Sequence, residues 1–256
     1  MTILLRKQQS RTKLPLQNPP FLLKCQDEKD REKEMVWFCN VTSDQQLGDR
    51  PGLRAKFYGE PWEQPYERYI GPTRPKKIIT SMNNCIEGEV LNREDFPESF
   101  AVYDESRFKK MKSLFWAAGF LVVKQDLADI FSLFDMGAGG LVQFPIYRAD
   151  EKILYPSSYY FLHFGNQKNT FVPEQSQKVF PSYFNKERNL QPWDVYPEAD
   201  GDVAVTEKAE EGPDIWIEPT VPGKLFMSDG LAVALRDAKI KPKIDWRLTK
   251  CRIVDE

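Results

Sequence analysis

Apolar positions near the end of the chain follow strand and helix spacing in turn, which predicts a strand, a helix and a second strand. Residues 224–227 form a short apolar run, and Ser228 is a residue type that caps helices. Residues 231–238 then carry apolar side chains at helical spacing, and Pro242 prevents the helix from continuing. Residues 244–248 alternate between apolar and polar positions, which predicts a half-buried strand.

An earlier part of the chain predicts a strand followed by an amphipathic helix. Residues 99–103 are mostly apolar, and Asp104 can cap a helix whose apolar stripe is formed by Phe108, Met111, Leu114 and Phe115. Gly119 stands where this helix would end, because glycine readily takes the left-handed conformation of a helix C-terminus. The unit would therefore pack one face of its helix on the core.

Three continuous apolar or aromatic runs follow, at residues 120–123, 141–147 and 158–164. Asp126, after the first of them, can cap a second helix. Such continuous runs are typical of strands that are covered on both faces. Together these patterns predict an α+β fold in which a mixed sheet packs with a few amphipathic helices, in a domain that spans residues 96–256.

The first 95 residues have a different character. Residues 1–34 are polar and mixed in charge, which predicts a polar N-terminal arm that is either loosely ordered or a solvated helix. Residues 35–95 are rich in aromatic residues and proline, with predicted strands at residues 35–39 and 77–81, and form either a separate lobe or part of the same domain. Their aromatic side chains either pack against the fold or form an exposed patch for a partner. The side chains in question are Trp62, Tyr66 and Tyr69.

Composition and charge argue against several classes of protein. With 41% hydrophobic and 29% charged residues, the chain has the composition of a folded protein. Its formal charge of −2 gives no global attraction to nucleic acid or to an anionic membrane. No run approaches the roughly 18 apolar residues of a membrane span, and the run at residues 3–5 is too short for a secretory signal. We therefore expect a cytoplasmic protein with neither a nucleic acid nor a membrane as its partner.

Residue types that perform catalysis or bind metals are sparse in this sequence. The four cysteines are far apart and form no CxxC pair, so we expect reduced, mostly buried thiols and no zinc site. His163 is the only histidine and lies within an aromatic run, without a Ser, Cys or acid in a recognisable catalytic arrangement. Residues 136–140 are glycine-rich but lack the Lys-Ser/Thr of a phosphate loop. We therefore expect no catalytic residue, no metal and no cofactor.

An acidic segment, residues 194–218, is the strongest electrostatic feature of the sequence. It holds nine carboxylates against Lys208 alone, which gives it a charge of −8 and leaves +6 for the rest of the chain. The segment is either a mobile, solvated loop or a surface that speeds encounter with a basic partner. Neighbouring aromatic side chains would then supply most of the affinity. The candidate partner-binding residues are Asp200, Asp202, Glu207, Glu210, Glu211, Trp193, Tyr196 and Trp216.

Three stretches occur in an order that resembles a known family: FLVVKQDLADIFSLFDMGAGGLVQFPIYRADEK, then SYYFLHFGNQKNTFVPEQS, then PDIWIEPTVPGKLFMSDGLAVALRDAKI. The order is similar to that of bacterial immunity proteins found beside polymorphic toxins of contact-dependent and secreted systems. The resemblance covers roughly residues 100–254. It implies an α+β toxin inhibitor of the toxin–antitoxin kind, used in bacterial competition, which is not an enzyme and which neutralises its cognate toxin by direct protein–protein interaction.

Two other functions fit the same sequence features. A stand-alone interaction or scaffold protein would also need a stable fold and a complementary surface, but its gene would have no toxin gene beside it. A carboxylate-based hydrolase would need paired acids, and nothing in the sequence pairs them. A neighbouring gene for a toxic domain would favour the immunity function, whereas a metabolic operon would favour the enzyme.

Overall fold

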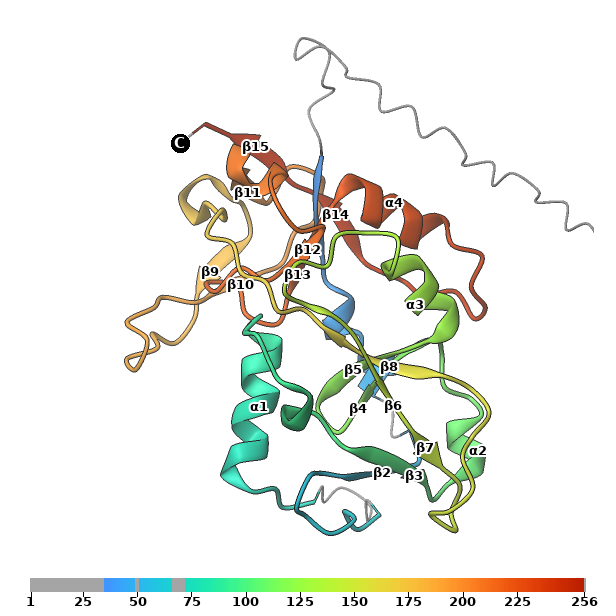
Figure 1. The fold of residues 1–256 in the computed structure, drawn as a ribbon. Coiled ribbons are helices and arrows are strands. Elements are labelled where there is room, and N and C mark those ends of the chain that lie inside the picture. The colour runs from blue at the N-terminus through green and yellow to red at the C-terminus, as the bar shows by residue number, and fades with distance from the viewer. Residues whose placement is uncertain (1–34, 49–50, 66–71, 256) are drawn as a thin grey trace, which may run out of the picture. The chain divides into compact units, whose positions relative to one another are not determined.

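The computed structural model describes residues 35–48, 51–65 and 72–255 of the chain. Within these residues, strands in several small sheets combine with four α-helices (Figure 1). The fold is therefore α+β, as the sequence predicts. Glu34–Glu256 forms one compact unit, and all statements below concern this unit.

The first of two four-stranded sheets contains the apolar runs from the middle of the sequence. Its order is β4 (Leu114–Ala117), β5 (Phe120–Lys124), β8 (Tyr159–His163) and β6 (Gly140–Phe144), and each neighbouring pair is antiparallel. We call it the middle sheet. β5 and β8 each pair with a neighbouring strand on both sides. The predicted apolar runs at residues 120–123 and 158–164 therefore form the centre of this sheet.

Both faces of the two central strands of the middle sheet are covered, which explains why β5 is apolar at its first four positions and β8 is apolar or aromatic up to His163. Along β5, Leu121 and Val123 belong to a first hydrophobic core, whereas Phe120 and Val122 belong to a second one. Successive side chains of a strand point to opposite faces, so an uninterrupted apolar run is what a sheet between two cores requires. The prediction that these strands are covered on both faces is confirmed for β5 and β8, whereas the edge strand β6 is only half-buried and exposes Gln143.

The second four-stranded sheet joins the two ends of the described chain. Its order is β12 (Ile215–Trp216), β13 (Leu225–Ser228), β1 (Val36–Cys39) and β14 (Leu248–Lys250), again antiparallel throughout. We call it the terminal sheet. The predicted strands at residues 35–39 and 224–227 are therefore next to each other, which fixes the N-terminal strand to the C-terminal part of the fold.

The terminal sheet also lies between two cores. Trp37 and Cys39 of β1 belong to the first core, and Val36 and Phe38 belong to a third core. The first core thus takes side chains from both four-stranded sheets and from the helices α3 and α4. The bounds of these helices are Gln125–Phe131 for α3 and Asp229–Asp237 for α4.

Smaller sheets and helices close the second and third cores. In the second, β2 (Leu53–Lys56), β3 (Ser99–Val102) and β7 (Ile146–Tyr147) form a three-stranded sheet beside α1 (Lys76–Ile86) and α2 (Glu105–Phe108). In the third, β11 (Ala204–Thr206) pairs in parallel with β15 (Arg252–Val254), and β9 (Val179–Pro181) pairs with β10 (Trp193–Val195). Short 3-10 helices are η1 Val41–Ser43, η2 Gln45–Gly48, η3 Arg93–Asp95, η4 Pro173–Gln175 and η5 Glu207–Glu210.

Two predicted helix caps are confirmed by hydrogen bonds. The Asp104 carboxylate accepts from the Arg107 backbone N–H at 3.1 Å, and the Ser228 hydroxyl accepts from the Leu231 N–H at 3.4 Å. Asp126 instead lies inside the first turn of α3, and Lys124 is the cap residue. The Asp126 carboxylate accepts from the Ser113 hydroxyl at 2.6 Å. Its role is therefore to tie α3 to the start of β4.

The helix predicted after Asp104 is only one turn long, and this part of the prediction is wrong. Leu114 and Phe115, which were expected on one helical face, point into the first and second cores respectively. That alternation belongs to a strand, and both residues lie in β4. Gly119, with φ +87°, forms the turn between β4 and β5 instead of ending a helix.

Two predicted strands are also wrong. Residues 77–81 lie in α1, where Ile78 and Cys85 face the second core at helical spacing. Residues 244–247 are irregular and only Leu248 of the predicted strand lies in β14; Arg247 is left-handed (φ 50°), and its backbone N–H donates to the Asp245 carboxylate at 3.1 Å. The run at residues 141–147 is divided by Pro145 between β6 and β7, which belong to different sheets.

The aromatic side chains before residue 81 are described only in part. Trp62 is half-buried, and the Arg54 guanidinium lies over its ring, with 5.6 Å between Arg54 Cζ and the ring centroid. Tyr66 and Tyr69 lie outside the described residues. The described strands β1 and β2 pair with strands from later in the chain, so they do not form a sheet of their own.

The three cysteines in the described residues are free and buried. Burial raises the pKa of the Cys39 and Cys85 thiols to about 12, and burial raises the pKa of the Cys251 thiol as well. Because the thiolate is the reactive form, these cysteines are structural side chains. The expectation of reduced, buried thiols is confirmed for these positions, and Cys25 lies outside the described residues.

Phe161 tests the packing of the middle sheet. Its fully buried ring stacks on Phe144 at 4.0 Å between centroids and on Phe96 at 5.1 Å. We expect Phe161→Ala to reduce the free energy of unfolding by about 3–5 kcal/mol, because truncation leaves a cavity in a close-packed core. Urea unfolding measures the loss, with Leu133→Ala, at a site that is 79% exposed, as the control. Equal losses in the two variants would show that the ring does not contribute as described.

Candidate partner-binding site

An antiparallel hairpin that we call the aromatic arm, residues 179–196, projects from the described unit (Figure 1). Its two strands, β9 and β10, pair with Asp194 directly opposite Phe180. Beyond the strands, the hairpin closes where the backbones of Asn185 and Leu190 exchange hydrogen bonds of 2.9 and 3.1 Å. Asn189 takes a left-handed conformation in this turn, with φ 50°, which asparagine tolerates better than most residues.

The base of the aromatic arm is fixed to the third core. Val195 is fully buried, and Trp193 and Val179 pack against the same core. The backbone N–H of Trp193 donates to the Thr220 carbonyl at 2.7 Å, and the backbone N–H of Tyr196 donates to the Lys178 carbonyl at 3.1 Å. These contacts define the direction in which the arm leaves the fold.

The outer positions of the aromatic arm expose four aromatic rings. Phe180 is 55% exposed, Tyr183 97%, Phe184 49% and Tyr196 57%. Phe180 and Tyr196 contact each other, with 6.4 Å between ring centroids. Exposed aromatic side chains gathered on one element are unusual on a protein without a partner, and aromatic anchors dominate the energetics of many interfaces.

The far end of the aromatic arm is held to the region after α1. The Arg188 guanidinium forms an ion pair with Glu87 at 2.5 Å and approaches Glu89 at 3.7 Å. The backbone N–H of Arg188 also donates to the side-chain oxygen of Asn185 at 3.1 Å. The arm is therefore supported at both of its ends, which reduces the entropy that it would lose on binding.

The acidic segment is folded into the unit and is not a solvated loop. Val203 and Val205 are fully buried in the third core, and β11 pairs with β15 along this stretch. Asp202 is buried because its carboxylate accepts from the backbone N–H groups of Glu198 and Ala199, at 2.8 and 2.9 Å. It therefore holds a turn and does not face a partner.

The remaining predicted acids lie at or near the surface. Asp200, Glu207 and Glu211 are exposed, and Glu210 is half-buried. Asp200 accepts from the Lys250 backbone N–H at 2.8 Å, which links it to the end of β14. Nearer the arm, Asp194 and Glu198 are also exposed. The exposed carboxylates follow the acidic segment over its length and do not gather at one point.

Trp216, a predicted anchor, is buried inside the protein with 1% of its side chain exposed. Its ring stacks on Phe226 at 6.0 Å, and its Nε1–H donates to the Glu218 carboxylate at 2.9 Å. The backbone N–H and hydroxyl of Thr170 donate to the same carboxylate. Trp216 therefore serves the structure in this conformation, and Trp193 and Tyr196 are the predicted aromatic residues that lie on the arm.

The cluster around Trp216 holds two ionisable groups in unusual environments. Burial raises the pKa of Glu218, and hydrogen bonds from Thr170 and Trp216 oppose this shift. Burial lowers the pKa of Lys168 to about 8, against the attraction of Glu218. The Lys168 Nζ lies 3.5 Å from the Trp216 ring centroid and donates to the Ala209 carbonyl at 3.0 Å. These contacts fasten η5 to the terminal sheet.

His163 is buried where β8 meets the segment after α1. Its Nε2 lies 3.1 Å from both the Leu91 amide nitrogen and the Glu89 carbonyl oxygen, and a neutral ring nitrogen can serve only one of them. The ring also meets Phe96 edge-on at 5.5 Å. Burial lowers the pKa of His163. These contacts give the side chain a packing role.

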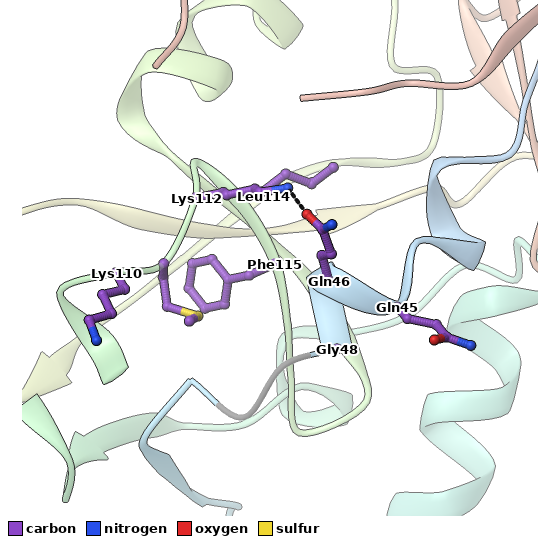
Figure 2. Close-up of a pocket in the computed structure, with 8 residues that line it drawn as sticks. Gln45, Gln46, Gly48, Lys110, Lys112, Leu114 and Phe115 are labelled. Atoms are coloured by element: carbon purple, nitrogen blue, oxygen red, sulfur yellow. Dashed lines mark hydrogen bonds between the residues drawn. The ribbon is translucent and has the colours of Figure 1, made fainter. Parts of the chain in front are cut away.

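A pocket of about 610 Å³ lies between η2 and the connection from α2 to β4 (Figure 2). Lys112 reaches across to donate to the Gln46 side chain at 2.9 Å. Lys110 and Gln45 supply further cationic and amide groups. Since its described lining contains no Ser, Thr, Cys, His, Asp or Glu, this pocket has hydrogen-bonding capacity without the usual groups of a hydrolytic site.

No group of three or more His, Cys, Asp or Glu side chains in the described part of the chain is placed to hold a metal ion. No helix there is long and apolar enough to cross a membrane. Comparison of the chain with protein-family models, with curated proteins and with solved structures gave no match.

The aromatic arm contains functional candidates that the sequence patterns did not single out: Phe180, Tyr183 and Phe184. A signal was present in the run VFPSYF at residues 179–184, where aromatic residues stand beside proline and polar residues without core periodicity. The exposure of these rings needed the structure, because the sequence does not reveal which face of β9 points outward.

The pH dependence of stability tests the role of His163. Its unfolded-state pKa is about 6.5, and the folded-state pKa is lower, so unfolding takes up a proton as the pH falls below neutrality. The contribution of His163 is therefore present above about pH 6.5 and is lost toward lower pH. We expect His163→Gln to be less stable than wild type at pH 7 and to lose less stability between about pH 7 and 5. Urea unfolding at several pH values measures this, and parallel losses would contradict it.

Lys168 should be identifiable by titration. In protein with reductively methylated, ¹³C-labelled lysines, we expect one NMR resonance to titrate near pH 8, because burial lowers the pKa of Lys168 to about 8. The resonance should be absent from Lys168→Arg, which keeps a positive charge at this position. A spectrum in which every lysine titrates near about pH 10 would contradict the described environment.

Proposed function

We propose that this protein is a bacterial immunity protein that binds a cognate toxin directly and neutralises it without catalysing a reaction. The resemblance of residues 100–254 to such proteins motivates the proposal. The exposed rings of the aromatic arm are the observation that carries it. Direct inhibition requires a stable scaffold and a complementary surface, and the three cores and the arm supply these two elements.

The aromatic arm has the properties of an interface anchor. Phe180 and Tyr196 form a contiguous pair on its outer face, and Tyr183 has almost its entire side chain in solvent. Large aromatic side chains bury much area and lose little conformational entropy on binding. Because contacts support the arm at both ends, its backbone needs less ordering when the partner arrives.

Carboxylates around the aromatic arm give the partner's surface an expected charge. Asp194 lies opposite Phe180 in the hairpin, and Glu198 follows the second strand at an exposed position. Glu198 forms an ion pair with Lys178 at 3.3 Å, whereas the exposed Glu207 and Glu211 extend the negative surface along η5. A toxin with a basic surface, such as a nuclease that binds a polyanion, would be attracted to this region.

The aromatic anchors are tested by a triple variant, Phe180→Ala, Tyr183→Ala and Tyr196→Ala. We expect affinity for the toxin encoded beside this gene to fall by about 100-fold or more, since truncating an interface anchor costs about 2 kcal/mol or more. Calorimetry measures the affinity, and co-expression with the toxin measures protection of growth. The control variant, Leu133→Ala, Ile153→Ala and Leu154→Ala, removes exposed apolar groups elsewhere and should bind normally.

The outcomes of this experiment separate the alternatives. Wild-type affinity in a folded triple variant would exclude the aromatic arm as the docking surface. Binding that leaves the toxin active would favour a scaffold protein over an immunity protein. Toxin that is chemically altered after incubation with the protein would contradict non-catalytic inhibition.

The carboxylates are tested by association kinetics. We expect Glu198→Gln, Glu207→Gln and Glu211→Gln together to slow association with the toxin by about tenfold at low salt and to flatten its salt dependence, with a smaller effect on dissociation. The charge-matched control is Glu60→Gln, Glu94→Gln and Asp129→Asn, which are exposed elsewhere. Stopped-flow fluorescence measures the rates. If both variants associate alike, the acidic segment does not steer the encounter.

A further inference from the structure

A second charged surface, of opposite sign, is formed by residues 236–250, which we call the basic segment. The segment begins in the last turn of α4 and ends with β14. It holds six Lys or Arg residues against two Asp residues, which gives a net charge of +4. The acidic segment has a charge of −8. The small net charge of the whole chain therefore conceals two surfaces that would attract different partners.

Three lysines of the basic segment are exposed, and one of them, Lys243, is close enough to Asp237 to attract its carboxylate. Lys239, Lys241 and Lys243 are exposed and make no hydrogen bond or ion pair with the described residues. The flanking arginines differ: Arg236 pairs with Asp237 at 2.9 Å, and Arg247 approaches Asp44 at 3.6 Å. The unpaired charges thus occupy alternate positions along one short stretch of chain.

Lys243, the last of these lysines, borders a pocket of about 550 Å³ whose lining is partly apolar. Trp37, Ile244, Trp246 and Leu248 supply its apolar groups, and Lys243 is at its edge together with the two flanking arginines. Asp245 also lines the pocket, but its carboxylate accepts from the Arg247 N–H at 3.1 Å. The site therefore combines an apolar recess with a cationic rim.

The tryptophans of this pocket are poorly placed to stack on a nucleobase. Only 6% of Trp37 and 4% of Trp246 is exposed. Cations already lie over the Trp37 ring, with Arg236 Cζ at 6.0 Å and Lys250 Nζ at 5.3 Å from its centroid. Stacking on single-stranded nucleic acid needs an open ring face. Membrane insertion would need projecting apolar side chains, and those of this pocket are recessed.

We propose that the basic segment binds an acidic segment of a partner protein. Carboxylates of the partner pair with Lys239, Lys241 and Lys243, and an aliphatic side chain between them enters the pocket beside Trp37. Charge complementarity selects the partner, while the apolar recess fixes its register. The basic segment shares no residue with the aromatic arm, and the inference does not depend on the proposed immunity function.

The probe for this site is a fluorescein-labelled peptide with four glutamates around a central leucine. We expect fluorescence anisotropy to show binding that weakens at high salt, and Lys239→Gln, Lys241→Gln and Lys243→Gln together to weaken it by about tenfold. The charge-matched control, Lys109→Gln, Lys110→Gln and Lys152→Gln, should bind as wild type does. All six lysines are exposed, so the variants should fold.

Further measurements make the inference specific. Replacing the peptide's leucine with serine should weaken binding, and the aromatic-arm triple variant should bind the peptide normally. Equal binding by the two lysine variants, or by the leucine and serine peptides, would overturn the proposal. Stronger binding of a 12-nucleotide oligothymidylate or of phosphatidylserine vesicles than of the peptide would also overturn it, in favour of a general polyanion surface.

Discussion

Burial of both faces of the two four-stranded sheets is the constraint on which the rest of this structure depends. In β5 and β1, neighbouring side chains belong to different cores, so a polar residue at any of these positions would be desolvated. The first core joins the sheets, while the second and third cover their outer faces. Helices and small sheets must therefore cover the faces of the two four-stranded sheets. α3 and α4 pack on the first core, α1 packs on the second, and the β11–β15 pair packs on the third.

The same arrangement determines which parts of the chain are available for recognition. Residues that cover the third core must alternate between inward and outward positions, and this places Val195 inside while Tyr196 remains in solvent. The acidic segment is held in the same way through β11, so its exposed charges have defined positions. Recognition therefore depends on the outer side of elements whose inner side stabilises the fold, and the aromatic arm is an extension of that covering layer.

The sequence predicted the elements whose local and tertiary preferences agree. The apolar strands and the caps at Asp104 and Ser228 are in this class. Residues 77–81 were mistaken for a strand because Ile78 and Ile79 favour strands locally, whereas packing of Ile78 and Cys85 on the second core selects a helix. In the candidate site, the exposure of Tyr196 agreed with prediction, but Trp216 lies between buried Ile215 and Ile217 and is enclosed. The acidic residues that neighbour Trp216 in sequence do not determine whether its ring points into the core or toward solvent.

The distribution of the buried cysteines has a practical consequence. Cys39 belongs to the first core, Cys85 to the second and Cys251 to the third. A thiol reagent can reach each sulfur only when the core around it opens, so the rate of labelling at each position reports the opening of one layer. The protein thus contains an intrinsic set of reporters, read by mass spectrometry without mutation, that can show whether its layers separate one at a time or together.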